Sequence, residues 1–306
     1  MLRQMGARLG SALLVMFGVC TLVFLLLHLV PGDPVEAMLG ESARPADRDA
    51  LRQALGLNLS VSEQYGRYLT GLLQLDLGRS FQDQRPVIEI MAERLPATLQ
   101  LTIAALTLAL VLAIPLGVLA AHRRGSGLDS GAMAFSLIGV SMPNFWLGPL
   151  LILVFSLWLG WTPVSGSDRP LSLVLPAITL GTALAAVLAR MVRASVLEVL
   201  GEDYVRTARA KGLSESAVLR RHALRNAWLP VLTLVGLQLG GLLGGAVITE
   251  TVFAWPGVGS LLVESIQARD FPVVQGCVLL ISLVYVLVNT LTDLAYVWLD
   301  PRIGRR

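Results

Sequence analysis

The stretch GEDYVRTARAKGLSESAVLRRHALRNAWLP, residues 201–230, is a basic polar segment set between two long apolar runs, 170–189 and 228–249. Each run is long enough to cross ~30 Å of hydrocarbon as a helix. Only helices and closed barrels satisfy their backbone groups in lipid. The segment is therefore predicted to join two membrane-spanning helices, which places the chain among helical membrane proteins.

The composition supports this interpretation over the whole chain. Of its 306 residues 55% are hydrophobic and only 15% are charged, with a mean hydropathy of +0.69, whereas soluble domains are about 25% charged. The predicted spans are 9–31, 95–122, 130–167, 170–189, 228–249 and 271–292, the last extending to about residue 299. Pro143, Pro149 and Pro163 interrupt the third, which is predicted to be one broken helix followed by an interfacial stretch. The fold class is all-α, a polytopic membrane protein with about six transmembrane helices.

The distribution of Lys and Arg residues predicts the orientation of the chain in the membrane. With the N-terminus inside, most of the Lys and Arg residues in the termini and short loops lie on the cytoplasmic side, which favours an N-in, C-in topology. The net charge of +3 then needs no nucleic-acid partner. The first apolar run is too long for a cleaved signal peptide and is predicted to be an anchor. Cys20 and Cys277 lie inside apolar spans, which indicates packing rather than a disulfide or metal pair, and no metal site is predicted.

The spans divide the chain into segments. They are an N-terminal transmembrane helix (1–31), an extracytoplasmic helical loop (32–96), a transmembrane core (97–299) with a cytoplasmic segment (194–228), and a cytoplasmic tail (300–306). Within the 32–96 loop, residues 43–58 and 61–82 show helical spacing, and Gly56 is a candidate C-cap. The loop is either a small helical cap or a contact for an extracytoplasmic partner or a gate.

The 201–230 stretch itself predicts two capped helices. Acidic residues stand at the start of the first helix and basic residues at its end, which suits the helix macrodipole. Gly212 then suits a left-handed cap, and Ser214 can cap a second helix. The acidic residues are Glu202 and Asp203, and the basic residues are Arg206, Arg209 and Lys211. A loop that merely binds anionic lipid explains the arginines, but the paired helices suit docking into a partner's groove.

This stretch resembles the cytoplasmic coupling segment of ABC importer permeases. The general pattern of that segment is met only at Ala208, Gly212 and Leu224, whereas the dipeptide, oligopeptide and nickel branch reads much like DYVRTARAKGL followed by RHALRN. Further stretches that resemble this branch are LHLVPGDP (27–34), GVSMPNFWL (139–147), FAWPGVG (253–259) and LDPRI (299–303). The resemblance covers essentially the whole chain and implies the type I importer permease fold.

The resemblance also implies partners. They are a second homologous permease, two ABC ATPase subunits, an extracytoplasmic solute-binding protein and the lipid bilayer. The residues expected to contact the ATPase are Glu202, Asp203, Arg206, Ala208, Arg209, Lys211, Gly212 and Leu224. A phosphate-binding loop needs Gly-Lys-Ser/Thr, yet Lys211 is the only lysine and follows Ala210. The chain is therefore expected not to be an enzyme and to bind no cofactor, with ATP and Mg in the ATPase subunits.

Other candidate residues lie in or near the spans. Gly236, Gly240 and Gly244 form a small-residue face, for packing within the bundle or for a subunit interface or pore. Polar or kinking residues mark either a translocation pathway or a structural kink; they are Ser141, Met142, Pro143, Asn144, Gln238 and Asn289. Pro256, Gly257 and Gly259 are predicted to form an outer turn, which the resemblance places near the outer gate and the binding protein.

These observations predict a function. The chain is expected to be the permease subunit of an ATP-driven importer of dipeptides or oligopeptides in the bacterial cytoplasmic membrane, working by alternating access. Import of nickel or a metal chelate is the alternative. A self-sufficient secondary transporter is a distant alternative, because we see no internal repeat and no charge in the middle of a span.

Overall fold

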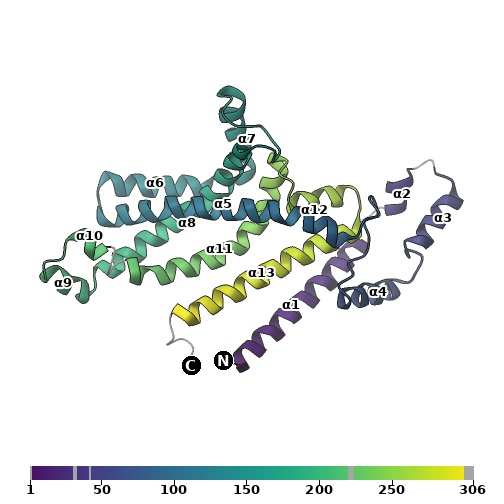
Figure 1. Cartoon of the computed structure of the whole chain (residues 1–306), viewed down its shortest axis with the longest axis horizontal. Helices are drawn as coiled ribbons and strands as arrows, with labels where there is room; N and C mark the ends of the chain where they lie inside the picture. Colours follow the sequence, from purple (N-terminus) through teal and green to yellow (C-terminus); the bar gives the residue numbers. More distant parts are fainter. Residues whose placement is uncertain (1, 30–32, 41–42, 220–223, 300–306) are drawn as a thin grey trace. The chain divides into compact units, whose positions relative to one another are not determined.

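The computed structural model describes residues 2–29, 33–40, 43–219 and 224–299, and within these ranges helices make up the architecture (Figure 1). The predicted cytoplasmic tail, 300–306, lies outside them. The elements before the first long span are α1 (Leu2–Leu29), α2 (Pro34–Leu39), α3 (Pro45–Ala54) and α4 (Val61–Leu73). Those that follow are α5 (Val87–His122), α6 (Gly127–Ser141), α7 (Asn144–Leu151), η1 (Ile152–Trp158), η2 (Pro170–Leu173) and α8 (Val174–Leu200). The last are α9 (Asp203–Ala210), α10 (Glu215–Val218), α11 (Leu224–Phe253), α12 (Val258–Gln267) and α13 (Phe271–Leu299).

The helices divide into two compact units. One unit contains residues 1–97 and 256–286, and the other contains 98–255 and 287–306. Residues 256–286, which carry α12 and the start of α13, thus group with the N-terminal part of the chain. We call residues 43–85 of the first unit, which hold α3 and α4, the α3–α4 segment.

Local signals explain the short helices of the first unit. The backbone N–H of Val35 donates to Asp33 at 2.9 Å, and this carboxylate caps α2. Ser60 and Glu63 form a capping box at the start of α4. Gly56 follows α3 with a φ of +70°, which confirms its predicted role in ending that helix. The core of the unit lies elsewhere, where α5, α12 and α13 meet; its buried members are Val87, Ile90, Met91, Val258, Leu261, Val273 and Cys277.

In the second unit, α8 is the central helix. It packs against α6, α7 and α11. Small residues allow these backbones to approach closely. A Cβ on Gly139 of α6 would lie 2.9 Å from the Cβ of Ala186, and one on Gly181 of α8 would lie 2.7 Å from the carbonyl oxygen of Ala105. Glycine is thus required at both positions.

The long helices suit a bilayer. Three are long and apolar enough to cross it, namely 87–122, 170–200 and 271–292. Two bent pairs raise the number of candidate spans to five in the described residues, 127–141 with 144–158 and 226–242 with 246–253. Residues 9–29 of the first predicted span lie in α1, whose apolar portion is the shorter stretch Leu13–Leu25, and residues 30–31 lie outside the described part of the chain. The structure is therefore roughly compatible with the predicted count of about six.

The third predicted span is broken as expected. Met142 adopts an extended conformation after α6, Pro143 is the N-cap of α7, and the chain turns by 103° between the two helices. Pro149 lies inside α7 and does not end it. A π-helix follows at once in η1, since a proline without an N–H disturbs the regular hydrogen-bond ladder.

Candidate coupling elbow and outer cavity

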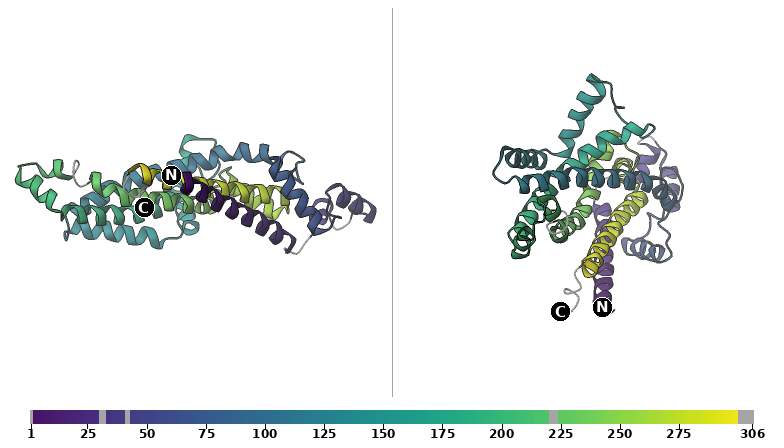
Figure 2. Two further views of the ribbon diagram at one scale, coloured as in Figure 1. Left: turned by 90° about the horizontal axis from the view of Figure 1, so that it is seen from below. Right: turned by 60° about the vertical axis from the view of Figure 1, so that its left-hand side comes forward.

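Within the basic stretch, residues 201–219 fold into a helix, a glycine turn and a short helix. We call residues 201–219 the elbow; it lies beyond the adjoining ends of α8 and α11 (Figure 2). Helix α9 has Asp203 in its first turn and Arg209 in its last, as the macrodipole favours. Of the predicted second helix, the structure describes α10 and Leu219, whereas residues 220–223 lie outside the described part of the chain.

Gly212 ends α9 in the predicted left-handed conformation, with a φ of +81°. Its N–H donates to the carbonyl of Arg209 at 2.9 Å, and the N–H of Leu213 donates to that of Ala208 at 3.3 Å. These two hydrogen bonds form a Schellman motif, which satisfies carbonyls that the helix leaves free. A residue with a Cβ would be strained here.

The elbow has a small hydrophobic core of its own. Val205, Ala208 and Val218 are buried, and Val199, Leu200 and Leu213 pack against them. Leu213 follows the Schellman motif and packs against this core, an apolar contact that commonly accompanies such a motif. The elbow is therefore a folded unit whose shape is set from inside.

Polar contacts fix the outside of the elbow. Arg209 donates to both carboxylate oxygens of Glu215 across the glycine turn, at 2.7 and 3.3 Å. This hydrogen bond lowers the pKa of Glu215 below its usual value. The side-chain amide of Asn226 donates to the hydroxyl of Tyr204 at 2.6 Å, which ties α9 to the start of α11.

The predicted coupling residues fall into two groups. Ala208 belongs to the core, and Leu224 is the half-buried first residue of α11. The rest form an exposed, charged face around the turn; they are Glu202, Asp203, Arg206, Arg209, Lys211 and Gly212. Whether this face meets an ATPase stays a prediction at this point.

The residues predicted to lie on the translocation pathway come from three separate parts of the chain. Ser141 to Asn144 occupy the break between α6 and α7. The Ser141 hydroxyl donates back to the carbonyl of Leu137 at 2.8 Å, a bond that often accompanies helix bending. Gln238 on α11 and Asn289 on α13 are both half-buried. A role of these residues in translocation stays a prediction.

The three glycines of the predicted small-residue face on α11 have different surroundings. A Cβ on Gly236 would collide with the side chain of Thr292 in α13. Gly240 is buried, whereas Gly244 is exposed and a Cβ there would meet nothing within 4 Å. The first end therefore serves packing within the unit, and a role of the open end at a subunit interface or pore stays a prediction.

The outer turn is shorter than predicted. The N–H of Trp255 donates to the carbonyl of Glu250 at 2.8 Å as α11 ends, and Ala254 takes the left-handed conformation with a φ of +47°. Pro256 and Gly257 continue the turn, and Gly257 is the N-cap of α12. Gly259 lies in the first turn of α12 rather than in the connecting turn, because the helix begins one residue earlier.

Three buried carboxylates were missed by sequence reasoning. Glu250 accepts from the hydroxyl of Thr98 at 2.7 Å, and Asp270 accepts from Ser80 at 2.5 Å and from the N–H of Phe81 at 3.0 Å. Asp129 is paired with an arginine of α8. Each carboxylate lies near the charged or polar border of an apolar run. That position was the only sign in the sequence that these carboxylates matter, and it does not indicate which residue pairs with each of them.

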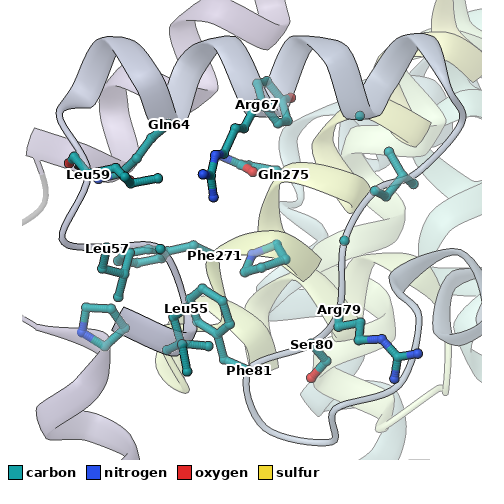
Figure 3. Close-up of a pocket in the computed structure, with 18 of the residues that line it drawn as sticks. Leu55, Leu57, Leu59, Gln64, Arg67, Arg79, Ser80, Phe81, Phe271 and Gln275 are labelled. Carbon is teal, nitrogen blue, oxygen red and sulfur yellow. Dashed lines mark hydrogen bonds between the residues drawn. The ribbon is translucent and has the colours of Figure 1, made fainter. Parts of the chain in front are cut away.

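The first unit also contains a cavity of about 730 Å³, lined by residues of α4, the neighbouring loops and the start of α13 (Figure 3). Leu55, Leu57 and Phe81 supply apolar surface, and Figure 3 shows Arg67 and Gln275 reaching into the space. This volume is typical of small-molecule sites. In the described residues, no group of three or more His, Cys, Asp or Glu side chains could hold a metal ion.

The fold defines a class, the helical membrane proteins with several candidate spans, and the charged elbow lies between two of these spans. Comparison with known families assigns the chain within this class. Residues 113–305 match the model of the binding-protein-dependent transport system inner membrane component, and residues 1–102 match the N-terminal model of such membrane components. The chain belongs to this family of multi-pass membrane proteins.

Several curated relatives match the chain along its length. The dipeptide transport system permease protein DppB of Escherichia coli K12 is 44% identical, with 100% of both chains covered. The di/tripeptide transport system permease protein DppB of Pseudomonas aeruginosa is 46% identical over 99% of each. The glutathione transport system permease protein GsiC of Escherichia coli K12 is 44% identical, again over 99% of each.

Solved structures show the same fold. An inward-facing structure of the MetNI methionine ABC transporter aligns with a TM-score of 0.60 at 21% identity, covering 71% of this chain and 99% of that chain. An amino acid ABC transporter with histidines aligns with a TM-score of 0.51 at 18% identity, covering 68% and 94%. The all-helical type I importer permease fold is thus confirmed.

Proposed function

We propose that this chain is the permease subunit of an ATP-driven importer of dipeptides or oligopeptides in the bacterial cytoplasmic membrane, with both termini in the cytoplasm. The observation that carries this proposal is the similarity, at 44–46% identity over essentially the full length, to permeases named for dipeptides and di/tripeptides. The glutathione transport permease, which is similar over nearly the same length, is also named for a peptide.

The elbow supports a mechanical role for this subunit. A rigid unit with its own core and a capped turn can carry a displacement into α8 and α11, which adjoin it. We propose that two ATPase subunits hold this elbow and its counterpart on a second homologous permease. ATP and Mg then stay in the ATPases, and an extracytoplasmic solute-binding protein delivers the peptide. The spans alternate between outward-open and inward-open states. Exposed ion pairs contribute only about 0–1 kcal/mol each, so the shape of the elbow is expected to decide docking more than its charge.

Import of nickel or a chelate is not favoured. The relatives described above are named for peptides, and the described residues offer no metal-binding cluster. A chelated metal would not need such a cluster, so the choice rests on the relatives. A secondary transporter is also not favoured, because the family to which the chain belongs is binding-protein-dependent.

The test is transport in cells that lack this chain. We expect the deletion strain to lose growth on a dipeptide as sole nitrogen source and uptake of the labelled dipeptide, and the restored gene to recover both. Nickel-dependent urease activity and nickel uptake, measured in the same strains, are expected to stay unchanged. Loss of nickel uptake with normal dipeptide uptake would contradict the proposal.

A further inference from the structure

One ion pair in the second unit is unlike the surface pairs of this protein. Arg193 of α8 donates from Nε to Oδ1 of Asp129 at 2.6 Å and from Nη2 to Oδ2 at 2.8 Å. Asp129 is buried in the first turn of α6, and only 24% of the Arg193 side chain is exposed. A bidentate pair of this kind fixes direction as well as distance.

The local structure around Asp129 leaves this carboxylate little freedom. The N–H of Gly125 donates to the same Oδ2 at 3.0 Å. Asp129 also stands in the first turn of α6, where a negative charge is favoured by the helix dipole. The carboxylate is therefore held from its own loop and helix while it holds Arg193, and one end of α6 is fixed to α8.

A second contact fixes the other end of α6. A Cβ on Gly139 would lie 2.9 Å from the Cβ of Ala186 and 3.4 Å from the carbonyl oxygen of Thr182. Asp129 and Gly139 are separated by ~15 Å along a helix, and their contacts on α8 are separated by a similar length in the opposite direction. The two helices therefore run antiparallel and touch at both ends of α6.

The two ends of the α6–α8 pair adjoin two regions that matter for the proposed function, namely the elbow and the break after α6. Helix α8 ends at Leu200 and continues directly into the elbow. Helix α6 ends at Ser141, where the chain turns by 103° through Met142 and Pro143. The ion pair thus stands at the elbow end of the α6–α8 pair, and the break in the third span stands at the far end of α6.

We propose that Asp129 and Arg193 lock α6 to α8, so that the two helices move as one body and carry a displacement of the elbow to the break at Met142 and Pro143. Both are positioning residues, which act through the helices and need not contact the substrate. The inference rests on the proposed importer function and adds the route by which the elbow reaches a candidate part of the pathway. A break at this place absorbs a change of angle that a continuous helix would resist.

The test uses the assembled transporter in proteoliposomes with its binding protein and a labelled dipeptide. In Asp129→Asn and Arg193→Gln variants we expect the amount of peptide imported per ATP hydrolysed to fall about tenfold, within the usual range of coupling between sites. Hydrolysis stimulated by the binding protein is expected to persist. The matched control is Glu93→Gln, which removes an exposed ion pair with Arg85 and is expected to leave the ratio unchanged.

The amount of peptide imported per ATP hydrolysed distinguishes an ion pair that makes the two helices move together from one that only stabilises the fold. Loss of folding or assembly lowers import and hydrolysis together and leaves the ratio intact, and that result would overturn the inference. So would a ratio that stays near the wild-type value at full activity. Wild-type vesicles give the reference, since absence of ATP-driven dipeptide import there would contradict the proposed function instead.

Discussion

The elbow and the α3–α4 segment are held in different ways. The elbow buries Val205, Ala208 and Val218 within nineteen residues, 201–219. Helices α3 and α4 bury no residue at all. The longer segment is held instead by contacts with other parts of the first unit. Tyr65 and Gln64 of α4 contact α1, and Asp270 accepts hydrogen bonds from Ser80 and Phe81. The shape of the elbow is thus set largely by a core within its own residues, whereas the α3–α4 segment depends on residues elsewhere in the first unit.

The largest effect is expected from the two positive-φ glycines that end α9 and α3. Gly212→Val and Gly56→Val introduce the same backbone strain, about 1–2 kcal/mol, at φ values of +81° and +70°. Because Gly212 shapes the face proposed to dock with the ATPase, we expect at least a tenfold loss of ATP hydrolysis stimulated by the binding protein, a coupling effect of ordinary size. Membrane insertion is expected to persist in both. Equal losses from Gly56→Val would erase the functional difference between the two regions.

A smaller effect is expected at the attachment point of the α3–α4 segment. Asp270→Ala leaves the Ser80 hydroxyl and the Phe81 N–H without their acceptor, at a cost of about 1–3 kcal/mol. We expect amide hydrogen exchange to rise at residues 80–83 and the midpoint of thermal unfolding to fall. Ser80→Ala removes one donor and is expected to have the milder effect. Unchanged exchange at Phe81 in the Asp270 variant would show that other contacts hold this loop.

The next comparison removes the same two methyl groups from each region. Val205→Ala empties part of the elbow core, where Val205 is fully buried, and is expected to cost about 1.5–2.5 kcal/mol locally. Val61→Ala changes a half-exposed residue at the start of α4 and is expected to cost less than about 0.5 kcal/mol. Limited proteolysis of the elbow measures the first effect. A Val205 variant as resistant as the wild type would mean that contacts outside the elbow determine its shape.

The smallest effect is expected from the ion pair across the glycine turn. Hydrogen bonding to Arg209 lowers the pKa of Glu215 in the folded protein, so the pair stabilises the elbow above the unfolded pKa of about 4.3. That contribution is lost as the pH falls through the lower folded value. The stability difference between wild type and Glu215→Gln is expected to be constant from about pH 8 to 5 and to vanish in stronger acid. A difference that grows on acidification would contradict this assignment.

Local patterns predicted the features that depend on neighbours in the sequence. The order of acids, bases and glycine predicted α9 and its left-handed cap at Gly212, and Pro143 predicted the break after α6. Pairings between distant residues were not predictable. Asp129 and Arg193 are 64 residues apart, and Ser80 and Asp270 are 190 apart. A single sequence carries no period that links such positions.

Glycine packing shows the same limit. The regular spacing on α11 drew attention to Gly236, Gly240 and Gly244, yet Gly244 meets nothing within 4 Å. The close approaches to α8 use Gly117, Gly139 and Gly181, which share no spacing that singles them out. Spacing reveals a face on one helix, but the helix that covers this face is chosen by the tertiary fold.

The absence of buried residues in α3 and α4 has an evolutionary consequence. Selection for folding constrains exposed helix positions only weakly, since substitutions there usually change stability by less than about 0.5 kcal/mol. Sequence drift is therefore expected to run faster between residues 45 and 73 than in the elbow. Surface changes there can accumulate one at a time, whereas changes in the elbow and in the ATPase proposed to hold it are expected to occur together.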